Sequence, residues 1–222
     1  MKQSTKVRII IFNILIEIYK KNKNFDDLFN LETKNNNLDE REKSFIFNVS
    51  LNTMRYSTHS KKILALFVKK KLKTNQFILF ASAICQMIYL NIKPYAVINE
   101  TVEVAKKIGL YPSFINAVLK KIIKEKESIK NLNITIENLP VWFQKEIKKD
   151  VNINLEKFLE SFFYEPSLHF VFKDQIFLQK FNEEFELSTQ KSAFMKSKKK
   201  IPEFSNYKDG NWWVQNYSSM LP

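Results

Sequence analysis

Residues 81–121 read ASAICQMIYLNIKPYAVINETVEVAKKIGLYPSFINAVLKK and predict three consecutive helices. Apolar residues recur at intervals of three and four, the spacing that places them on one face of a helix. The first helix is expected to end near Asn91, ahead of Pro94. Gly109 suits the left-handed position that closes the second helix, and Ser113 suits the cap of the third. The stretch therefore predicts the core of a helical fold.

Two asparagines interrupt this apolar pattern. Asn99 either caps the second helix or lies inside a helix that begins at Pro94 as its first residue. Asn116 lies within an apolar run, so we expect its side chain to form a hydrogen bond across a helix contact. Both residues are interpreted as structural positions and not as ligands.

The same letters carry a family resemblance. The segment P-Y-A-x-I-N-E-x-V-E-x-A-K-K begins at Pro94 and includes Asn99 and Glu100, and it is followed by F-I-N-A-V-L-K-K, which includes Asn116. This two-part motif resembles the NusB-like RNA-binding domain. That domain occurs alone as a transcription antitermination factor and also at the N-terminus of cytosine methyltransferases of ribosomal RNA. The resemblance implies an all-helical bundle that binds RNA.

An upstream segment carries a second part of the resemblance. L-D-E-R-E-K-S-F, residues 38–45, is similar to the family signature L-x-x-R-D-R-x-F, with Arg41 and Phe45 at the matching places. Asp39 and Glu42 have the spacing of a capping box at the start of a helix. We expect Phe45 to face the core and Arg41 to hold a carboxylate in a bidentate ion pair, in preference to an RNA contact.

This helix is expected to end at N-T-M-R, residues 52–55, where the family usually shows G-x-L-R. Arg55 matches, and Asn52 replaces the glycine, which is tolerable because Asn adopts left-handed backbone more easily than other residues. Arginine occurs only at Arg8, Arg41 and Arg55 in a chain that is otherwise rich in lysine. A position that keeps arginine is more suited to a role that needs the planar guanidinium.

Net charge favours a polyanionic partner. The formal charge is +13 and the sequence pI is about 9.6. A lysine-rich codon bias and ordinary solvated helix faces are the alternative explanation. The candidate RNA contacts lie on the predicted first helix, at the end of the Arg55 segment and on the last two helices of the opening stretch. They are Lys2, Lys6, Arg8, Arg55, Lys106, Lys107, Lys120, Lys121 and Lys124.

Composition excludes several other classes of site. Two glycines, Gly109 and Gly210, cannot build a Gly-rich nucleotide or S-adenosylmethionine loop. The single Cys85 excludes an internal disulfide and lies on an apolar face, so we expect a buried thiol. His59 and His169 are too few for a zinc site. We therefore expect no catalytic, cofactor-binding or metal-binding residues in this chain.

The membrane is an unfavourable partner on the same evidence. No apolar run is long enough to span a bilayer, and Asn13 and Glu17 break the one near the N-terminus, so no signal peptide is predicted. The first helix is amphipathic, but its apolar face is better used in the core than on acidic lipid. We expect a cytoplasmic monomer.

The second half of the chain has a different character. We place a boundary at residue 131, which divides a helical RNA-binding domain, 1–130, from a helical linker and small α/β region, 131–222. L-P-x-W, residues 139–142, resembles the P-x-W-L segment that follows the NusB-like domain in the methyltransferases. Leu168–Lys173 predicts a strand and Gln175–Phe185 a short helix. His169 is expected to pack half-exposed in that strand. The predicted fold is mainly α with a small α/β appendage.

The last residues extend the resemblance. D-G-N-W-W-V-Q-N-Y-S-S-M-L-P, residues 209–222, is similar to G-x-x-x-V-Q-D-x-A-S-x-L, which precedes the catalytic domain in the methyltransferases, with Leu221 at the final matching place. The resemblance implies the RNA-binding N-terminal part of a Sun/Fmu-type cytosine-C5 methyltransferase of small-subunit (16S) ribosomal RNA, without its catalytic domain. S-adenosylmethionine is then expected only for the complete enzyme. The alternative is a stand-alone NusB-type antitermination factor that binds RNA and a protein partner.

Overall fold

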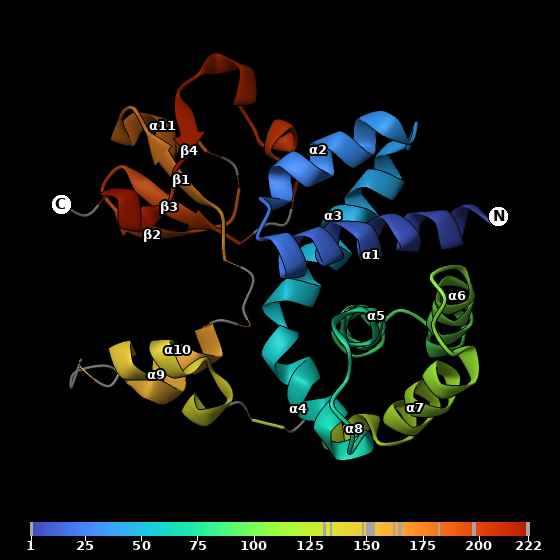
Figure 1. Ribbon diagram of the computed structural model, residues 1–222. Helices are drawn as coiled ribbons and strands as arrows, with labels where there is room; N and C mark the ends of the chain where they lie inside the picture. The colour runs from blue at the N-terminus through green and yellow to red at the C-terminus, as the bar shows by residue number, and fades with distance from the viewer. Residues whose placement is uncertain are drawn as a thin grey trace. The chain divides into compact units, whose positions relative to one another are not determined.

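Two compact units make up the chain, Met1–Phe163 and Tyr164–Pro222. The computed structural model describes residues 2–130, 132–133, 135–147, 149, 154–161, 163, 166–181, 183–196 and 199–220. In the described residues the first unit is helical and the second is built on a small sheet (Figure 1). The predicted fold class, mainly α with an α/β appendage, is confirmed.

The first unit consists of helices joined by short turns. Its elements are α1 (Gln3–Lys21), α2 (Phe25–Asn35), α3 (Glu40–Arg55), α4 (Ser57–Phe67), α5 (Thr74–Ile84) with a π-helical turn at its end (Cys85–Tyr89), α6 (Pro94–Lys107), α7 (Pro112–Lys124), α8 (Lys126–Lys130), a 3-10 turn (Ile136–Asn138), α9 (Val141–Ile147) and α10 (Leu155–Ser161).

Helix α5 lies at the centre of this unit. It contacts α1, α3, α4, α6 and α7, and Figure 1 shows it nearly end-on with these helices around it. All residues from Ile78 to Ile84 are buried, because a helix surrounded by others needs apolar side chains on every face. Phe80 and Ile84 are completely inaccessible to solvent. The continuous apolar run Phe77–Ala81, which leads into the opening stretch, therefore marks the helix that lies at the centre of the unit.

Most of the predicted helix ends are confirmed. Asp39 and Glu42 form the capping box, since the Glu42 amide donates to Asp39 Oδ1 at 2.7 Å and the Asp39 amide donates to Glu42 Oε2 at 3.0 Å. Gly109 is left-handed, with φ of 71°, just past the end of α6. Asn91 is also left-handed, with φ of 52°, and closes the segment that begins as α5. Helix α6 begins at Pro94, so Asn99 is an exposed position in its second turn and not a cap.

Three local predictions were wrong. Helix α7 begins at Pro112, so Ser113 is its second residue and not its cap; proline is favoured at that first position because its missing N–H would be unpaired there. Asn52 stays helical within α3, where its side-chain amide donates to the Asn48 carbonyl at 2.9 Å, and adopts no left-handed turn. Asn116 is half-buried, but its side chain forms no hydrogen bond with any residue that the structure describes.

A four-stranded antiparallel sheet forms the second unit. Its elements are β1 (His169–Phe172), α11 (Gln175–Gln179), β2 (Phe185–Thr189), β3 (Ser192–Met195), β4 (Trp212–Val214) and 3-10 turns at Ile201–Glu203, Tyr207–Asp209 and Tyr217–Met220. The strand order is β2-β3-β1-β4, with Phe170 of β1 opposite Ala193 on one side and Val214 on the other. The predicted strand is confirmed. The predicted helix is shorter than expected, because Phe185 already begins β2.

Aromatic side chains fill the core of the second unit. Phe170 and Trp212 stack with ring centroids 4.4 Å apart, and Phe181 and Phe204 meet them edge-on. His169 is only 3% exposed, so the expectation of a half-exposed histidine was wrong. Its burial is possible because both ring nitrogens have partners.

The partners of His169 connect three segments of the second unit. Nδ1 lies 3.0 Å from the Gln215 carbonyl oxygen and Nε2 lies 2.7 Å from Ser188 Oγ. The Ser188 hydroxyl in turn contacts Ser192 Oγ at 2.9 Å. The histidine therefore joins β1 to β2 and to the residue after β4.

Candidate nucleic-acid interface

The net positive charge of the chain comes from its first part. Residues 1–124 carry 22 Lys and Arg against nine Asp and Glu, whereas residues 125–222 carry 14 of each kind. The whole excess of +13 therefore belongs to the helices from α1 to α7. Such an uneven distribution attracts a polyanion to one part of the molecule.

Candidate lysines on α1 and α6 meet at one cavity. Lys2, just before α1, and Lys107 of α6 line a cavity of about 550 Å³. Its other lining residues are Thr5, Asn99, Glu100, Val102 and Glu103. Lys106 is held by an ion pair with Glu103. Lys6 donates from Nζ to the Asn36 carbonyl at 3.2 Å. Lys2 and Lys107 are exposed and form no ion pair within the described part of the chain, so they are the lysines of this group most available to a ligand.

Glu100 joins α6 to the start of α1. It accepts hydrogen bonds from Ser4 Oγ at 2.8 Å and from Thr5 Oγ1 at 2.6 Å. Burial raises the pKa of the Glu100 carboxyl, but the two hydrogen bonds and the charges of Arg8 and Lys2 together bring that pKa below its ordinary value. The carboxylate therefore stays ionised and neutralises part of the basic surface beside it.

Arg8 is engaged within the bundle. Its Nε donates to Gln86 Oε1 at 3.1 Å, its Nη1 donates to the Ser4 carbonyl at 3.1 Å, and its guanidinium lies 5.2 Å from the centre of the Phe45 ring. Burial lowers the pKa of Arg8, and the Glu100 charge partly opposes that effect. These hydrogen bonds and the partial burial of Arg8 limit its access to a ligand, although the sequence placed it among the candidate contacts.

Helix α7 presents a second group of candidates, Lys120, Lys121 and Lys124. All three are exposed and form no ion pair among the residues that the structure describes. A helix rises about 1.5 Å per residue, so Lys124 lies about 18 Å along α7 from Pro112. Lys107 precedes that first end, separated from Pro112 by the turn at 108–111. The nine candidates thus form two separate lysine groups, with Arg8 and Arg55 apart from both.

Phe45 and Arg41, the two motif residues on α3, differ in their burial. Phe45 packs half-buried against the core and under the Arg8 guanidinium, which confirms that it faces inward. Arg41 is exposed and has no carboxylate partner in the described part of the chain, so the expected bidentate ion pair was wrong. Arg41 is exposed because it lies five residues before the buried Ile46, which places it about 140° around the helix from that residue.

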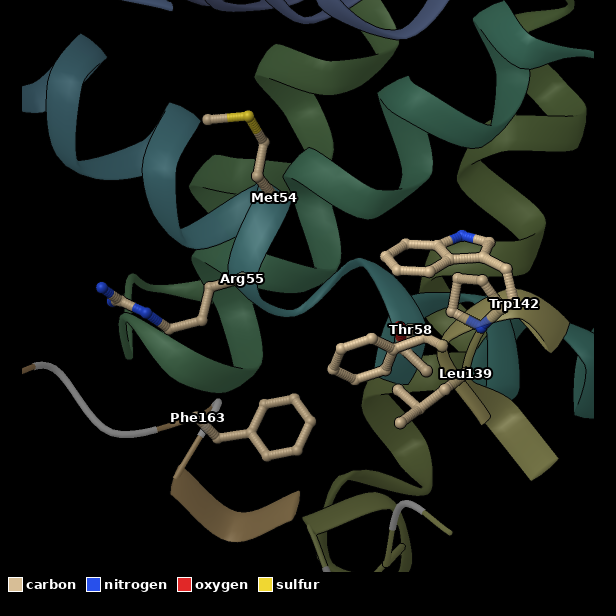
Figure 2. Close-up of a pocket in the computed structure, with 8 residues that line it drawn as sticks. Met54, Arg55, Thr58, Leu139, Trp142 and Phe163 are labelled. Carbon is tan, nitrogen blue, oxygen red and sulfur yellow. The ribbon is translucent and has the colours of Figure 1, made fainter. Parts of the chain in front are cut away.

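Arg55 borders a pocket that sequence reasoning missed. The pocket has a volume of about 350 Å³ and is formed by the end of α3, the start of α4 and the segment after α8. Figure 2 shows Arg55 and Trp142 on opposite sides, with Thr58, Leu139 and Phe163 between them. The L-P-x-W segment was the one signal for this pocket, since its Leu139, Pro140 and Trp142 all line it.

An aromatic cluster lies beside this pocket. Tyr56 stacks on Tyr89 with ring centroids 3.7 Å apart and parallel planes, and His59 lies 4.1 Å from the Phe163 ring. The Tyr56 hydroxyl donates to the Phe163 carbonyl at 3.0 Å. Burial lowers the pKa of His59 to about 4, with a backbone hydrogen bond at Leu132 opposing the change. The cluster holds Phe163 against Tyr56 at the junction of α3 and α4 and against His59 of α4.

Other classes of site find no support in the described residues. No group of three His, Cys, Asp or Glu side chains there could hold a metal ion. Cys85 is fully buried, as expected from the sequence, and burial raises the pKa of its thiol to about 12. None of the described helices has the length and hydropathy needed to cross a bilayer. Leu221, the last residue of the C-terminal motif, lies outside the described residues.

Comparison with known families assigns the helical bundle. The sequence model of the NusB family matches residues 5–124. The chain belongs to the NusB family. The match runs from α1 to the end of α7, and it coincides with the part of the chain that carries the excess charge. Residues 125–222 lie beyond the NusB match. A sequence search among curated proteins finds no match.

Two solved structures with TM-scores of 0.51 and 0.50 show the same fold as the helical bundle. The crystal structure of antitermination factors NusB and NusE in complex with dsRNA is 19% identical with a TM-score of 0.51, and the alignment covers 56% of this chain and 98% of that one. The crystal structure of a plectonemic RNA supercoil contains a chain that is 19% identical with a TM-score of 0.50, at 60% and 100% coverage. The solution structure of NusB from Aquifex aeolicus is 18% identical with a TM-score of 0.48, at 61% and 97% coverage.

Proposed function

We propose that this chain binds RNA through its NusB domain, mainly by contacts of lysine with phosphate. The observation that carries the proposal is the location of nearly all of the net charge within the residues of the NusB match, where 21 Lys and Arg face nine Asp and Glu. The exposed lysines of α7 and Lys107 of α6 are the contacts that the geometry supports best, because they have no carboxylate partner among the described residues. The related NusB structure solved with NusE and dsRNA supports the same partner class.

We further propose that the chain is the RNA-binding part of a ribosomal RNA cytosine-C5 methyltransferase, which binds and orients small-subunit ribosomal RNA. The L-P-x-W and V-Q-N-x-S-S segments support this proposal, as does the presence of a second folded unit after the NusB domain. Leu139 and Trp142 of the first segment line one pocket together with Met54 and Arg55 of α3 and Thr58 of α4, so this segment lies beside the NusB domain.

The residues present do not fit S-adenosylmethionine. Gly109 and Gly210 each end a short turn with left-handed backbone, and they are 101 positions apart, so they cannot form a Gly-rich loop together. We assign no step of methyl transfer to these residues. In the complete enzyme, S-adenosylmethionine would supply the methyl group, while this chain contributes RNA binding alone.

Salt dependence tests the RNA proposal. Binding of a fragment of small-subunit ribosomal RNA, followed by fluorescence anisotropy, should weaken steeply as salt rises. If about five phosphates are contacted, log affinity should fall with log salt at a slope of roughly −3.5 to −4.5. An affinity that does not change with salt, or no binding at low salt, would refute the proposal.

A methyl-transfer assay tests the proposal that this chain contributes RNA binding and no catalytic centre. The purified chain, incubated with labelled S-adenosylmethionine and ribosomal RNA, is expected to leave the RNA unlabelled. The incorporation of label above that of a protein-free control would show that these residues contain a catalytic centre after all.

A second candidate function is a stand-alone NusB-type antitermination factor. The solved complex of NusB and NusE with dsRNA favours it, because nearly the whole of that NusB chain aligns with this one. An affinity pull-down separates the two candidates. Recovery of ribosomal RNA precursors supports the methyltransferase part, and recovery of transcription elongation factors supports the antitermination factor.

A further inference from the structure

The pocket between Arg55 and Trp142 is built from a fixed backbone. The segment that carries Trp142 is held at the start of α9, where the Phe143 and Gln144 amides both donate to the Pro140 carbonyl at 3.0 Å. The Gln144 side chain also donates to the Leu139 carbonyl at 2.8 Å. Trp142 thus projects from a constrained first turn and not from a free loop.

Trp142 is unusually exposed for its size. Its side chain is 67% exposed, and its ring meets that of Phe143 at 67° with centroids 5.3 Å apart. Exposing so much aromatic surface at the edge of a cavity is unfavourable unless something covers it. The indole and the half-buried Phe163 ring therefore offer aromatic surfaces to an occupant.

Cationic groups accompany these aromatic surfaces. Arg55 uses Nη1 to donate to Asn52 Oδ1 at 2.6 Å, and within the described part of the chain its guanidinium has no carboxylate partner. Lys145 lies one turn after Trp142 on α9, exposed and also without an ion pair among the described residues. An apolar peptide has no negative charge to pair with these two cations, whereas each nucleotide carries a phosphate as well as a base.

We propose that this pocket binds an unpaired nucleobase of single-stranded RNA, with Trp142 stacking on the base and Arg55 and Lys145 contacting its phosphates. The inference rests on the proposed RNA-binding function and adds a subsite that joins Arg55 of the NusB match to residues beyond that match. The volume of about 350 Å³ lies within the range of about 300–1,000 Å³ that is typical of small-ligand pockets. Proteins read single-stranded RNA by stacking splayed bases on aromatic rings beside positive charge. Bases within a duplex are already stacked and cannot enter.

A single-stranded RNA and a duplex RNA distinguish binding in this pocket from binding to the lysines of the NusB domain. We would measure the affinities of a single-stranded oligonucleotide and of a blunt duplex of the same length for the wild-type chain and for Trp142→Ala, Trp142→Phe and Trp213→Ala. Trp213 is a matched control, since it is also exposed but belongs to the second unit. Trp142→Ala should weaken single-strand binding about tenfold, which corresponds to about 1.4 kcal/mol. It should leave duplex binding unchanged.

The remaining variants complete the test. Trp142→Phe should keep most of the single-strand affinity because a ring remains, and Trp213→Ala should bind as the wild type does. Saturating single-stranded RNA should quench tryptophan emission in the wild type more than in Trp142→Ala. Equal single-strand affinity of the wild type and Trp142→Ala, or an equal loss for both RNAs, overturns the subsite while leaving RNA binding intact. Absence of all binding by the wild type refutes the proposed function instead.

Discussion

The Nε atom of Arg8 in α1 donates a hydrogen bond to Oε1 of Gln86, 3.1 Å away in the π-helical turn that ends α5. Gln86 is 1% exposed, and its Nε2 donates to the Ser82 carbonyl at 3.1 Å. A buried amide needs partners for both its oxygen and its nitrogen. Arg8 therefore completes the hydrogen bonding of the central helix, which explains why an arginine near the N-terminus is half-buried.

Replacing Arg8 should destabilise the NusB bundle. Arg8→Met keeps the apolar stem but leaves Gln86 Oε1 without its donor, and an unsatisfied buried polar group costs about 1–3 kcal/mol. Urea denaturation measures the free energy of unfolding. Lys20→Met is the matched control, because Lys20 is an exposed residue of the same helix without an ion pair in the described part of the chain. Its effect should stay within about 0.5 kcal/mol. Equal stabilities of the two variants would contradict the structural role of Arg8.

Removing two lysines from α7 should weaken RNA binding without unfolding the protein. Lys120→Ala combined with Lys121→Ala should reduce the steepness of the salt dependence by about 1.4, since each phosphate contact with single-stranded nucleic acid contributes about 0.7. Anisotropy titrations at several salt concentrations give this slope.

The control for the lysine pair comes from the second unit. Lys191→Ala combined with Lys196→Ala removes the same charge from residues that are also exposed, and it should leave the slope unchanged. If both double variants lowered the slope equally, the RNA surface would extend beyond the NusB domain.

His59 should make the stability depend on pH between 6.5 and 4. Burial lowers the pKa of this histidine from 6.5 to about 4, so between these values the unfolded chain takes up a proton that the folded chain refuses. The stabilising free energy linked to the lowered pKa of His59 is fully present above pH 6.5 and is lost as the pH falls toward 4. The slope attributable to one proton is at most about 1.4 kcal/mol per pH unit.

His59→Phe provides the comparison. A phenyl ring fits beside Phe163, whose ring lies 4.1 Å from that of His59, and it cannot titrate. Urea denaturation at pH 7, 5.5 and 4.5 should show the wild type losing stability relative to the variant as the pH falls. A difference that stays constant with pH would contradict the lowered pKa.

Cys85 should be unreactive in the folded protein. Burial raises the pKa of its thiol to about 12, although a hydrogen bond from Thr53 and the charge of Arg55 act in the opposite direction. Reaction with a thiol reagent requires the thiolate and access. At pH 8 the folded chain should show no titratable thiol with a chromogenic disulfide reagent, and the chain in concentrated urea should show one. Rapid labelling of the folded protein would contradict this.

Local structure was well predicted because its causes lie within a few residues. The capping box of Asp39 and Glu42, the left-handed Gly109 and the apolar run of α5 each depend on neighbours along the chain. The π-helical turn at Cys85–Tyr89 was missed, since helical periodicity differs little between one α turn and one π turn. The failed predictions for Ser113 and Asn52 concern single positions at helix ends, where packing chooses between adjacent residues.

By itself, the sequence determined the helical bundle, its family and the part of the chain that carries the net positive charge. Only the tertiary structure decided what individual polar residues do. Arg8, a candidate ligand contact in the sequence, donates a hydrogen bond to Gln86. His169 is buried because Gln215 and Ser188 satisfy the hydrogen bonding of its ring. Trp142 borders a pocket only because α3 and α4 lie opposite. The physical reason is that apolar spacing acts along one helix, whereas a polar side chain acquires its role from atoms that distant segments bring to it.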